Sequence, residues 1–188
     1  IRVNGVIKME SKNLMLRESE FADCRLFAEW EARKDVNEFF TMNEDRDYEE
    51  IVRDFFNFSA DPTKEMYTIV LKPEDKPIGR IYLSRIDKEE DSIDLTRIYI
   101  ADSENRNKGY GEEAIRMILE YTFINLHMER VTIDHFVANE PAAFLYHKIG
   151  FVDEGKMRHA GKKNGKYVDL CLMSMLRAEY YDKIHSDK

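Results

Sequence analysis

The spacing of apolar residues predicts a short strand and two helices in the first third of the chain. The strand covers residues 14–18, and residues 20–33 then place apolar side chains on one helical face, with Ser19 positioned to cap the first turn. The second helix repeats apolar positions at the i, i+3, i+4, i+7, i+8 spacing, at Tyr48, Ile51, Val52, Phe55 and Phe56. Residues 36–42 mix aromatic and polar side chains, which is typical of a loop.

Alternating and β-branched segments predict three strands in the middle of the chain, at residues 66–72, 77–86 and 93–100. Polar turns at 73–76 and 87–91 separate them, which indicates an antiparallel meander. A helix over residues 111–126 and a β-branched strand over 131–137 follow. Because strand, helix and strand in this order form one right-handed crossover, strands 93–100 and 131–137 are expected to be parallel neighbours.

Turn and cap residues define the last third of the chain. Pro141 near the start and Gly150 after the end bound a helix at 142–149. Strands 151–159 and 167–176 follow, joined through an Asn164-Gly165 pair that is typical of a hairpin. From Arg177 onward the chain is polar, and we expect it to end in a short helical turn.

No internal repeat, low-complexity segment or linker interrupts this pattern, which predicts a single α/β (α+β) domain with a mostly antiparallel sheet. We expect the domain to cover residues 11–182. Residues 1–10 are expected to be a loose tail or an expression remnant, and residues 183–188 a C-terminal tail.

Composition limits the possible partners. A chain of 188 residues can bury one sizeable core, and its formal charge of −8 argues against nucleic acid or an anionic membrane as partner. No apolar run approaches the ~18 residues of a membrane span and no signal-peptide pattern opens the chain, so a cytoplasmic location is expected. Cys24 and Cys171 lie on apolar sides of predicted elements and are expected to be buried free thiols. The histidines show no ligand spacing, and no metal site is expected.

The glycine-rich loop before helix 111–126 is the main candidate for chemistry. Its residues are Arg106, Asn107, Lys108, Gly109, Tyr110 and Gly111. Bare backbone N–H groups at a glycine-rich helix start can hold a phosphate. Residues 109–114 also match the loose dinucleotide fingerprint G-x-G-x-x-A. That alternative is disfavoured by context, because eight residues separate strand from glycine and only one crossover unit is visible.

The pattern Arg106-x-x-Gly109-x-Gly111 resembles the R/Q-x-x-G-x-G/A signature of the GNAT superfamily of N-acetyltransferases. A second block, from Asn139 through residues 143–151 (AFLYHKIGF), is similar to that family's N-x-x-A-x-x-L-Y-x-K-x-G-F block. The opening at 14–17 and the end at 164–176 resemble the subgroup of ribosomal-protein N-terminal acetyltransferases and spermidine acetyltransferases. The resemblance extends over residues 12–180.

This resemblance implies a GNAT fold, with a six- to seven-stranded sheet, about four helices, and a fourth and fifth strand that splay apart. In that family the pantetheine arm of acetyl-CoA fills the gap, which here assigns the backbones of Ile98, Tyr99 and Ile100 to it. The pyrophosphate of coenzyme A would lie over residues 106–111. By the same resemblance Asn139 hydrogen-bonds the cofactor arm, and relatives are often dimers, so a homodimer is possible.

Direct acetyl transfer needs a general acid and a neutral amine. Tyr146 matches the family's usual general acid, which protonates the departing thiolate; without the surrounding block it would be read as a core aromatic residue. Asp94, on the fourth strand, is the candidate base and His135 is a second candidate. Loss of the proton to solvent before binding is a further alternative.

The first two helices and the loop between them carry a cluster of acidic residues: Glu29, Glu31, Asp35, Glu38, Glu44, Asp45, Asp47, Glu49 and Glu50. Such a cluster can attract a polyamine, an aminoglycoside or a basic N-terminal peptide, or it can form two solvated helix faces. The sequence therefore predicts an acetyl-CoA-dependent transferase that acts on a primary amine. The alternative is a non-catalytic acyl-CoA-binding sensor or partner module.

Overall fold

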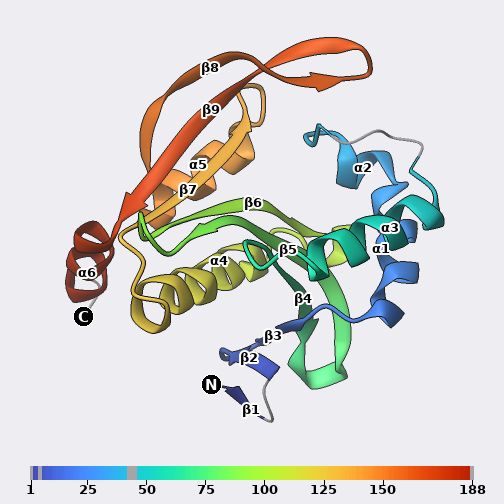
Figure 1. Cartoon of the computed structure of the whole chain (residues 1–188), viewed down its shortest axis with the longest axis horizontal. Helices are drawn as coiled ribbons and strands as arrows, with labels where there is room; N and C mark the ends of the chain where they lie inside the picture. Colours follow the sequence, from blue (N-terminus) through green and yellow to red (C-terminus); the bar gives the residue numbers. More distant parts are fainter. Residues whose placement is uncertain (1, 4–5, 42–45, 187–188) are drawn as a thin grey trace.

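The computed structural model describes residues 2–3, 6–41 and 46–186 and shows a strongly twisted sheet with helices on both faces (Figure 1). In sheet order the strands are β1 (Arg2–Val3), β2 (Val6–Glu10), β3 (Leu14–Glu18), β4 (Glu65–Leu71), β5 (Lys76–Asp87), β6 (Ser92–Ile100), β7 (Arg130–Phe136), β9 (Lys166–Leu176) and β8 (Val152–Lys163). All neighbouring strands are antiparallel except β6 and β7. The expected mostly antiparallel sheet is confirmed.

The helices are α1 (Cys24–Glu31), α2 (Lys34–Asn37), α3 (Tyr48–Ser59), α4 (Tyr110–Glu120), α5 (Glu140–Ile149) and α6 (Arg177–Ser186). Short 3-10 turns cover Phe21–Asp23, Lys72–Glu74 and Ser103–Asn105, and a π-helical turn, Tyr121–Asn125, continues α4. Among the described residues, no helix combines the length and the apolar character needed to cross a membrane.

The two faces of the sheet carry separate hydrophobic cores. On one face, Ile69 of β4 and Ile81 of β5 pack with Ile115 of α4 and Ile149 of α5. On the other face the helices are α1 and α3, and the cluster includes Phe27 of α1. Successive side chains of a strand point to opposite faces of the sheet. Because helices cover both faces, each face buries its own set of apolar side chains, and two cores result.

The parallel pairing of β6 with β7 is short, and this opens the sheet. Only three residue pairs join the two strands, the last being Asp94 with Thr132. Beyond that point β6 continues to Ile100 alongside β5, and β7 continues to Phe136 alongside β9. The expected splay between the fourth and fifth predicted strands is therefore present, between β6 and β7.

A bulge in β6 accompanies the splay. Tyr82 pairs with Arg97 and Leu83 pairs with Leu95, which leaves Thr96 as one extra residue on β6. An extra residue reverses the alternation of side chains and increases the local twist. Leu95 and Ile98, three residues apart, consequently pack against the same core.

Several predictions of local structure need correction. Part of the expected N-terminal tail is strand β2, because the outer edge of β3 is open and accepts it, with Met9 opposite Leu16. The helical segment at the C-terminus is α6, which runs ten residues to Ser186 rather than a single turn. Ser19 is no cap: Glu20 holds that position, and the Ser19 hydroxyl lies 3.0 Å from the Thr68 hydroxyl.

Of the two cysteines, Cys24 is fully buried as expected, whereas Cys171 is only partly buried; both are free thiols. The Cys171 Sγ lies 3.5 Å from an Asp153 carboxylate oxygen. Burial raises the pKa of both thiols, which keeps them in the unreactive protonated form.

The hairpin of β8 and β9 turns at Asn164-Gly165, where both residues have positive φ angles of 48° and 77°, as the sequence predicts for this pair. The hairpin reaches across to the segment that follows α2 (Figure 1). Lys163 Nζ donates to the carbonyl of Asn37 at 3.0 Å. The α2 region and the hairpin thus flank the opening between β6 and β7.

Candidate active site

A cleft of about 860 Å³ occupies the opening between β6 and β7. Its walls come from β6, the loop after β6, the start of α4, α5, β7 and the segment around α2. Most residues singled out in the sequence line it: Asp94, Ile98, Tyr99, Ile100, Arg106, Asn107, Gly109, Gly111, His135, Asn139 and Tyr146. The fold therefore brings segments 94–111 and 134–146 to one site.

The β6 wall offers main-chain groups to a ligand. From Leu95 to Ile100 no described residue pairs with the strand on the β7 side, and buried main-chain groups need hydrogen-bond partners. The carbonyl of Ile100 is already satisfied, since Arg106 Nε donates to it at 2.9 Å. A chain of amides, such as a pantetheine arm, fits a strand edge of this kind.

The loop that leads into α4 forms an open cradle. Asn107 and Gly109 have positive φ angles of 58° and 83°, and Gly109 is the residue that precedes the first turn of α4. A Cβ atom on Gly109 would meet nothing within 4 Å, and one on Gly111 would meet only a Leu145 methyl group at 3.9 Å. The unpaired N–H groups at this helix start therefore face space that a phosphate can enter.

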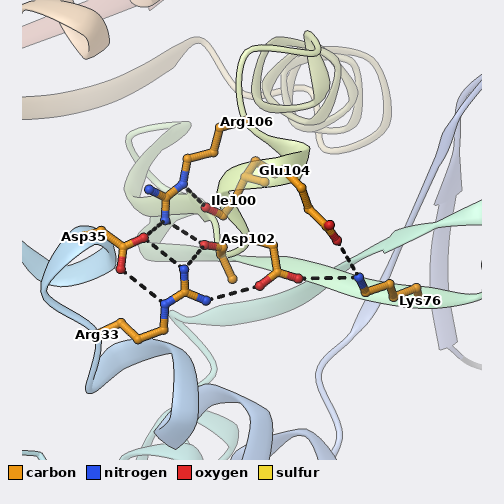
Figure 2. A network of polar contacts seen from close by, with 8 residues as sticks. Arg33, Asp35, Lys76, Ile100, Asp102, Glu104 and Arg106 are labelled. Atoms are coloured by element: carbon orange, nitrogen blue, oxygen red, sulfur yellow. Dashed lines mark hydrogen bonds and ion pairs between the residues drawn. The ribbon is translucent and has the colours of Figure 1, made fainter.

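Figure 2 shows the network of charges that holds this loop. Arg106 Nη2 donates to the carbonyl of Ala101 at 2.6 Å and pairs with Asp35 at 2.8 Å. Asp35 also accepts from Arg33, which keeps the Asp35 pKa below its ordinary value. Arg33 also forms an ion pair with Asp102, and Asp102 forms a further ion pair with Lys76. The Arg106 side chain thus braces the loop against β6 and α2, and its main-chain N–H donates to the carbonyl of Ser103 at 3.2 Å.

Two residues of the glycine-rich loop, Lys108 and Tyr110, lie away from the cleft. Lys108 is exposed and does not line the cleft, and neither does Tyr110, which packs against the core beneath the sheet. Asn105, which the sequence did not single out, lines the cleft and is 5% exposed, with a side-chain Nδ2 that has no partner among the described residues. A buried amide without a partner is costly unless a ligand or water satisfies it.

Tyr146 projects from α5 into the cleft. Its side chain is 8% exposed, its ring packs against Phe151 and His135, and its hydroxyl has no hydrogen bond to another described residue. Burial, and next the charge of Asp134, raises the pKa of Tyr146. The phenol is therefore neutral and able to donate a proton, although its ring also belongs to the core.

Asn139 lies at the start of α5, where its Oδ1 accepts from the N–H of Ala142 at 3.2 Å. This cap explains an Asn at the position. It leaves the Nδ2 of the side chain as the donor toward the cleft. The sequence-based role of Asn139 toward a cofactor arm stays a prediction.

The candidate bases have different surroundings. Asp94 is 3% exposed and accepts from the hydroxyls of Thr96 and Thr132, both at 2.7 Å, while Arg85 pairs with it at 3.1 Å. The Nδ1 of His135 donates to the carbonyl of Phe136 at 2.9 Å, because a carbonyl can only accept, and its buried Nε2 has no partner within the part of the chain that the structure describes. Asp94 is thus fully engaged.

Asp134 is a cleft residue that the sequence reasoning missed. It lies on β7 opposite Leu172 of β9 and has no hydrogen bond or ion pair to another described residue. Burial, and next the charge of Asp94, raises the pKa of Asp134 above the ordinary value. The sequence feature that could have identified Asp134 is its position as a lone carboxylate inside the β-branched strand 131–137.

Two members of the acidic cluster of the first two helices, Glu31 and Asp35, are paired with arginines. Glu31 is fully buried and bound to arginines, and Asp35 belongs to the network of Figure 2. Asp47 and Glu50 cap α3. Glu44 and Asp45 lie outside the described residues. Exposed members of the cluster are Glu29, Asp35, Glu38, Asp47 and Glu49.

Comparison with known proteins identifies the family. The model of the acetyltransferase (GNAT) domain matches residues 13–152. The chain belongs to the GNAT acetyltransferases. As a GNAT N-acetyltransferase it is an acyl-transferring enzyme, and members of this family use acetyl-CoA as the donor.

Two relatives of this GNAT chain match almost its whole length, and a third matches about half of it. An uncharacterized N-acetyltransferase, p20 of Bacillus licheniformis, is 26% identical over 176 residues, covering 90% of this chain and 96% of the relative. The spermidine N(1)-acetyltransferase of Vibrio cholerae is 25% identical over 173 residues, covering 92% and 98%. YdaF of Bacillus subtilis, a ribosomal N-acetyltransferase-like protein, is 32% identical over 102 residues, which covers 54% of this chain and 55% of YdaF.

Solved structures show the same GNAT fold. The crystal structure of the Vibrio cholerae spermidine N-acetyltransferase in complex with CoA and spermine superposes with a TM-score of 0.82, at 23% identity over 91% of this chain and 99% of the other. At that level of identity the similarity shows the fold.

Proposed function

We propose that this chain transfers an acetyl group from acetyl-CoA directly to a primary amine, with Tyr146 as the general acid. The observation that carries the proposal is the Tyr146 hydroxyl, which lines the opening between β6 and β7 and has no partner among the described residues. A neutral phenol at this position is a suitable proton donor for a departing thiolate.

The walls of the cleft fit the donor. The edge of β6 at Ile98, Tyr99 and Ile100 would hold the pantetheine arm, except at the Ile100 carbonyl, which Arg106 occupies, and Asn139 would add a side-chain donor. The main chain of residues 106–111 would hold the pyrophosphate through the N–H groups that follow Arg106, because Gly109 and Gly111 leave them uncovered. Exposed Lys108 could add only a solvated charge.

For the acceptor we propose a small polyamine-like amine or a protein N-terminus, as in the relatives that act on spermidine or resemble ribosomal acetyltransferases. Phe39 and Phe136 form an edge-to-face aromatic pair that lines the cleft, together with Asp134. An apolar wall with a carboxylate suits a short aliphatic ammonium ion. If a polyamine is the acceptor, its turnover should fall as salt is raised.

The test is thiol release from acetyl-CoA with a panel of polyamines, amino acids and basic peptides. Tyr146→Phe should lower kcat by about 10²- to 10⁴-fold, with little change in the Kd of acetyl-CoA, because the ring packing is kept. Tyr181→Phe on α6 removes a hydroxyl from a 38% exposed ring and serves as the matched control.

Two outcomes contradict parts of the proposal. Equal rates for wild type and Tyr146→Phe would remove the acid role. Tight binding of acetyl-CoA without turnover of any amine would favour the alternative, a non-catalytic acyl-CoA-binding module.

A further inference from the structure

Two carboxylates face the cleft at the point where β6 and β7 separate, and their bonding differs. Asp94 and Thr132 form the last residue pair between the strands, and Asp134 lies two residues further along β7, on the same side of that strand as Thr132. Asp94 accepts hydrogen bonds on both oxygens and carries an ion pair to Arg85. Asp134 has none of these contacts.

Four titratable groups among the described residues interact electrostatically with Asp134. Asp94 faces it from β6 and Arg85 from β5, while His135 adjoins it on β7. From α5, the Tyr146 hydroxyl lies within range of its charge. Its partner on β9, Leu172, is neutral. Arg85 is 74% exposed at its side chain and already paired with Asp94, so Asp134 has no cation of its own.

We propose that Asp134 is the catalytic base, which receives the ammonium group of the acceptor and takes its proton. This inference rests on the proposed function and assigns the base within it. It differs from the sequence-based choice, Asp94, because a base needs an atom free to accept the proton, and both Asp94 oxygens already accept hydrogen bonds. The Nε2 of the second candidate, His135, has no partner among the described residues either, but of these two only Asp134 offers the negative charge that attracts an ammonium ion. Asp94 instead forms an ion pair with Arg85, and its charge raises the pKa of Asp134.

Asp134 and Tyr146 together can carry out both proton transfers that the reaction needs. Asp134 accepts one proton from the ammonium ion, which leaves an amine nitrogen with a lone pair. That nitrogen forms the bond to the thioester carbonyl carbon while the C–S bond breaks and its electron pair leaves with sulfur. Tyr146 donates a proton to the sulfur, and the second proton of the attacking nitrogen restores the phenol. Asp134 then releases its proton to solvent.

A raised pKa in a folded protein supports this assignment. The ionised form of Asp134 is disfavoured by burial and by Asp94, so the fold is less stable with this charge than with a neutral group of the same shape. This cost in stability is present above the raised folded pKa and vanishes as pH falls below the ordinary carboxyl value. A bound ammonium ion would supply the positive charge that the Asp134 carboxylate does not have beside it in the free protein.

The experiment compares Asp134→Asn with wild type, using amines that the panel identifies as acceptors. Asp134→Asn should lower kcat/KM at pH 7 by at least about 100-fold and leave the Kd of acetyl-CoA unchanged. The loss should shrink as pH rises toward the pKa of the amine, because free neutral amine becomes available. Asp134→Glu should recover part of the rate.

A stability measurement separates this role from a structural one. Asp134→Asn should raise the melting temperature at pH 8, and the gain should disappear near pH 4. Asp182→Asn, an exposed carboxylate on α6, should change neither property. A variant that loses activity and melts lower than wild type at pH 8 would overturn the proposal.

The pH profile distinguishes the two carboxylates. The acidic limb of kcat/KM should be absent in Asp134→Asn. In Asp94→Asn it should persist and move to lower pH, since Asp94 no longer raises the pKa of its neighbour. The reverse pattern would assign the base to Asp94. Full activity of Asp134→Asn, together with a loss in Tyr146→Phe, would sink this inference alone, whereas no turnover by wild type would sink the proposed function and this inference with it.

Discussion

Replacing Glu31 by Ala should destabilise the protein far more than its place in an acidic helix suggests. Glu31 is 0% exposed. Its Oε1 accepts from Arg80 at 2.9 Å and from the Tyr99 hydroxyl at 3.0 Å, and its Oε2 accepts from Arg46 at 3.0 Å. One carboxylate therefore joins α1 to β5 and β6.

The magnitude follows from what Arg80 would lose. Arg80 is 1% exposed and lies between the rings of Phe27 and Tyr82, at 3.7 and 4.1 Å from their centroids. Those rings help to hold the cation but cannot replace its counter-ion. Breaking a buried ion pair from one side costs about 3–5 kcal/mol, and we expect a loss in that range.

The assay is equilibrium unfolding in urea at pH 7, analysed by linear extrapolation. Glu29→Ala, two residues away on the exposed face of α1, is the matched control and should change the free energy of unfolding by less than about 0.5 kcal/mol. A double-mutant cycle with Arg80→Ala should show strong coupling, because the second change removes the stranded charge. A loss below about 1 kcal/mol, or additive single effects, would refute the reasoning.

Two further predictions concern pH and the glycine loop. Asp23 is buried, which opposes its charge, but Arg17 and the N–H of Glu20 donate to it and hold its pKa below the ordinary value. Asp23→Asn should therefore cost about 2 kcal/mol at pH 7, and in acid titrations its deficit should vanish as pH falls through that lowered pKa; a deficit that is constant with pH would contradict the assignment. Gly109→Val and Gly165→Val place a β-branched residue at φ angles of 83° and 77° with nothing within 4 Å of the new Cβ. Both variants should lower the free energy of unfolding by about 1–2 kcal/mol. Calorimetry should show at least tenfold weaker acetyl-CoA binding only for Gly109→Val. Equal affinities of the two variants would show that the loop before α4 is not part of the binding site.

Local patterns in the sequence were sufficient for most of the fold. The meander of β4, β5 and β6, the crossover through α4, and the hairpin at Asn164-Gly165 follow from periodicity and turn chemistry, which depend on neighbours along the chain. The family and the location of the glycine loop followed from two motifs in the same way. Strand β2 was missed because its pairing depends on an open edge of β3, which no local pattern reveals.

The chemistry of individual side chains was decided by contacts across the sheet. The sequence shows Glu31 as one acid among nine, and only the packing of α1 on β5 makes it a buried counter-ion for Arg80. The choice between Asp94 and Asp134 likewise depends on which hydroxyls and cations lie beside each one after β6 and β7 diverge. Sequence determined which segments carry the site, because segments are defined by local periodicity. Tertiary structure alone decided which groups in them stay free to react, because burial and partners come from residues distant in the chain.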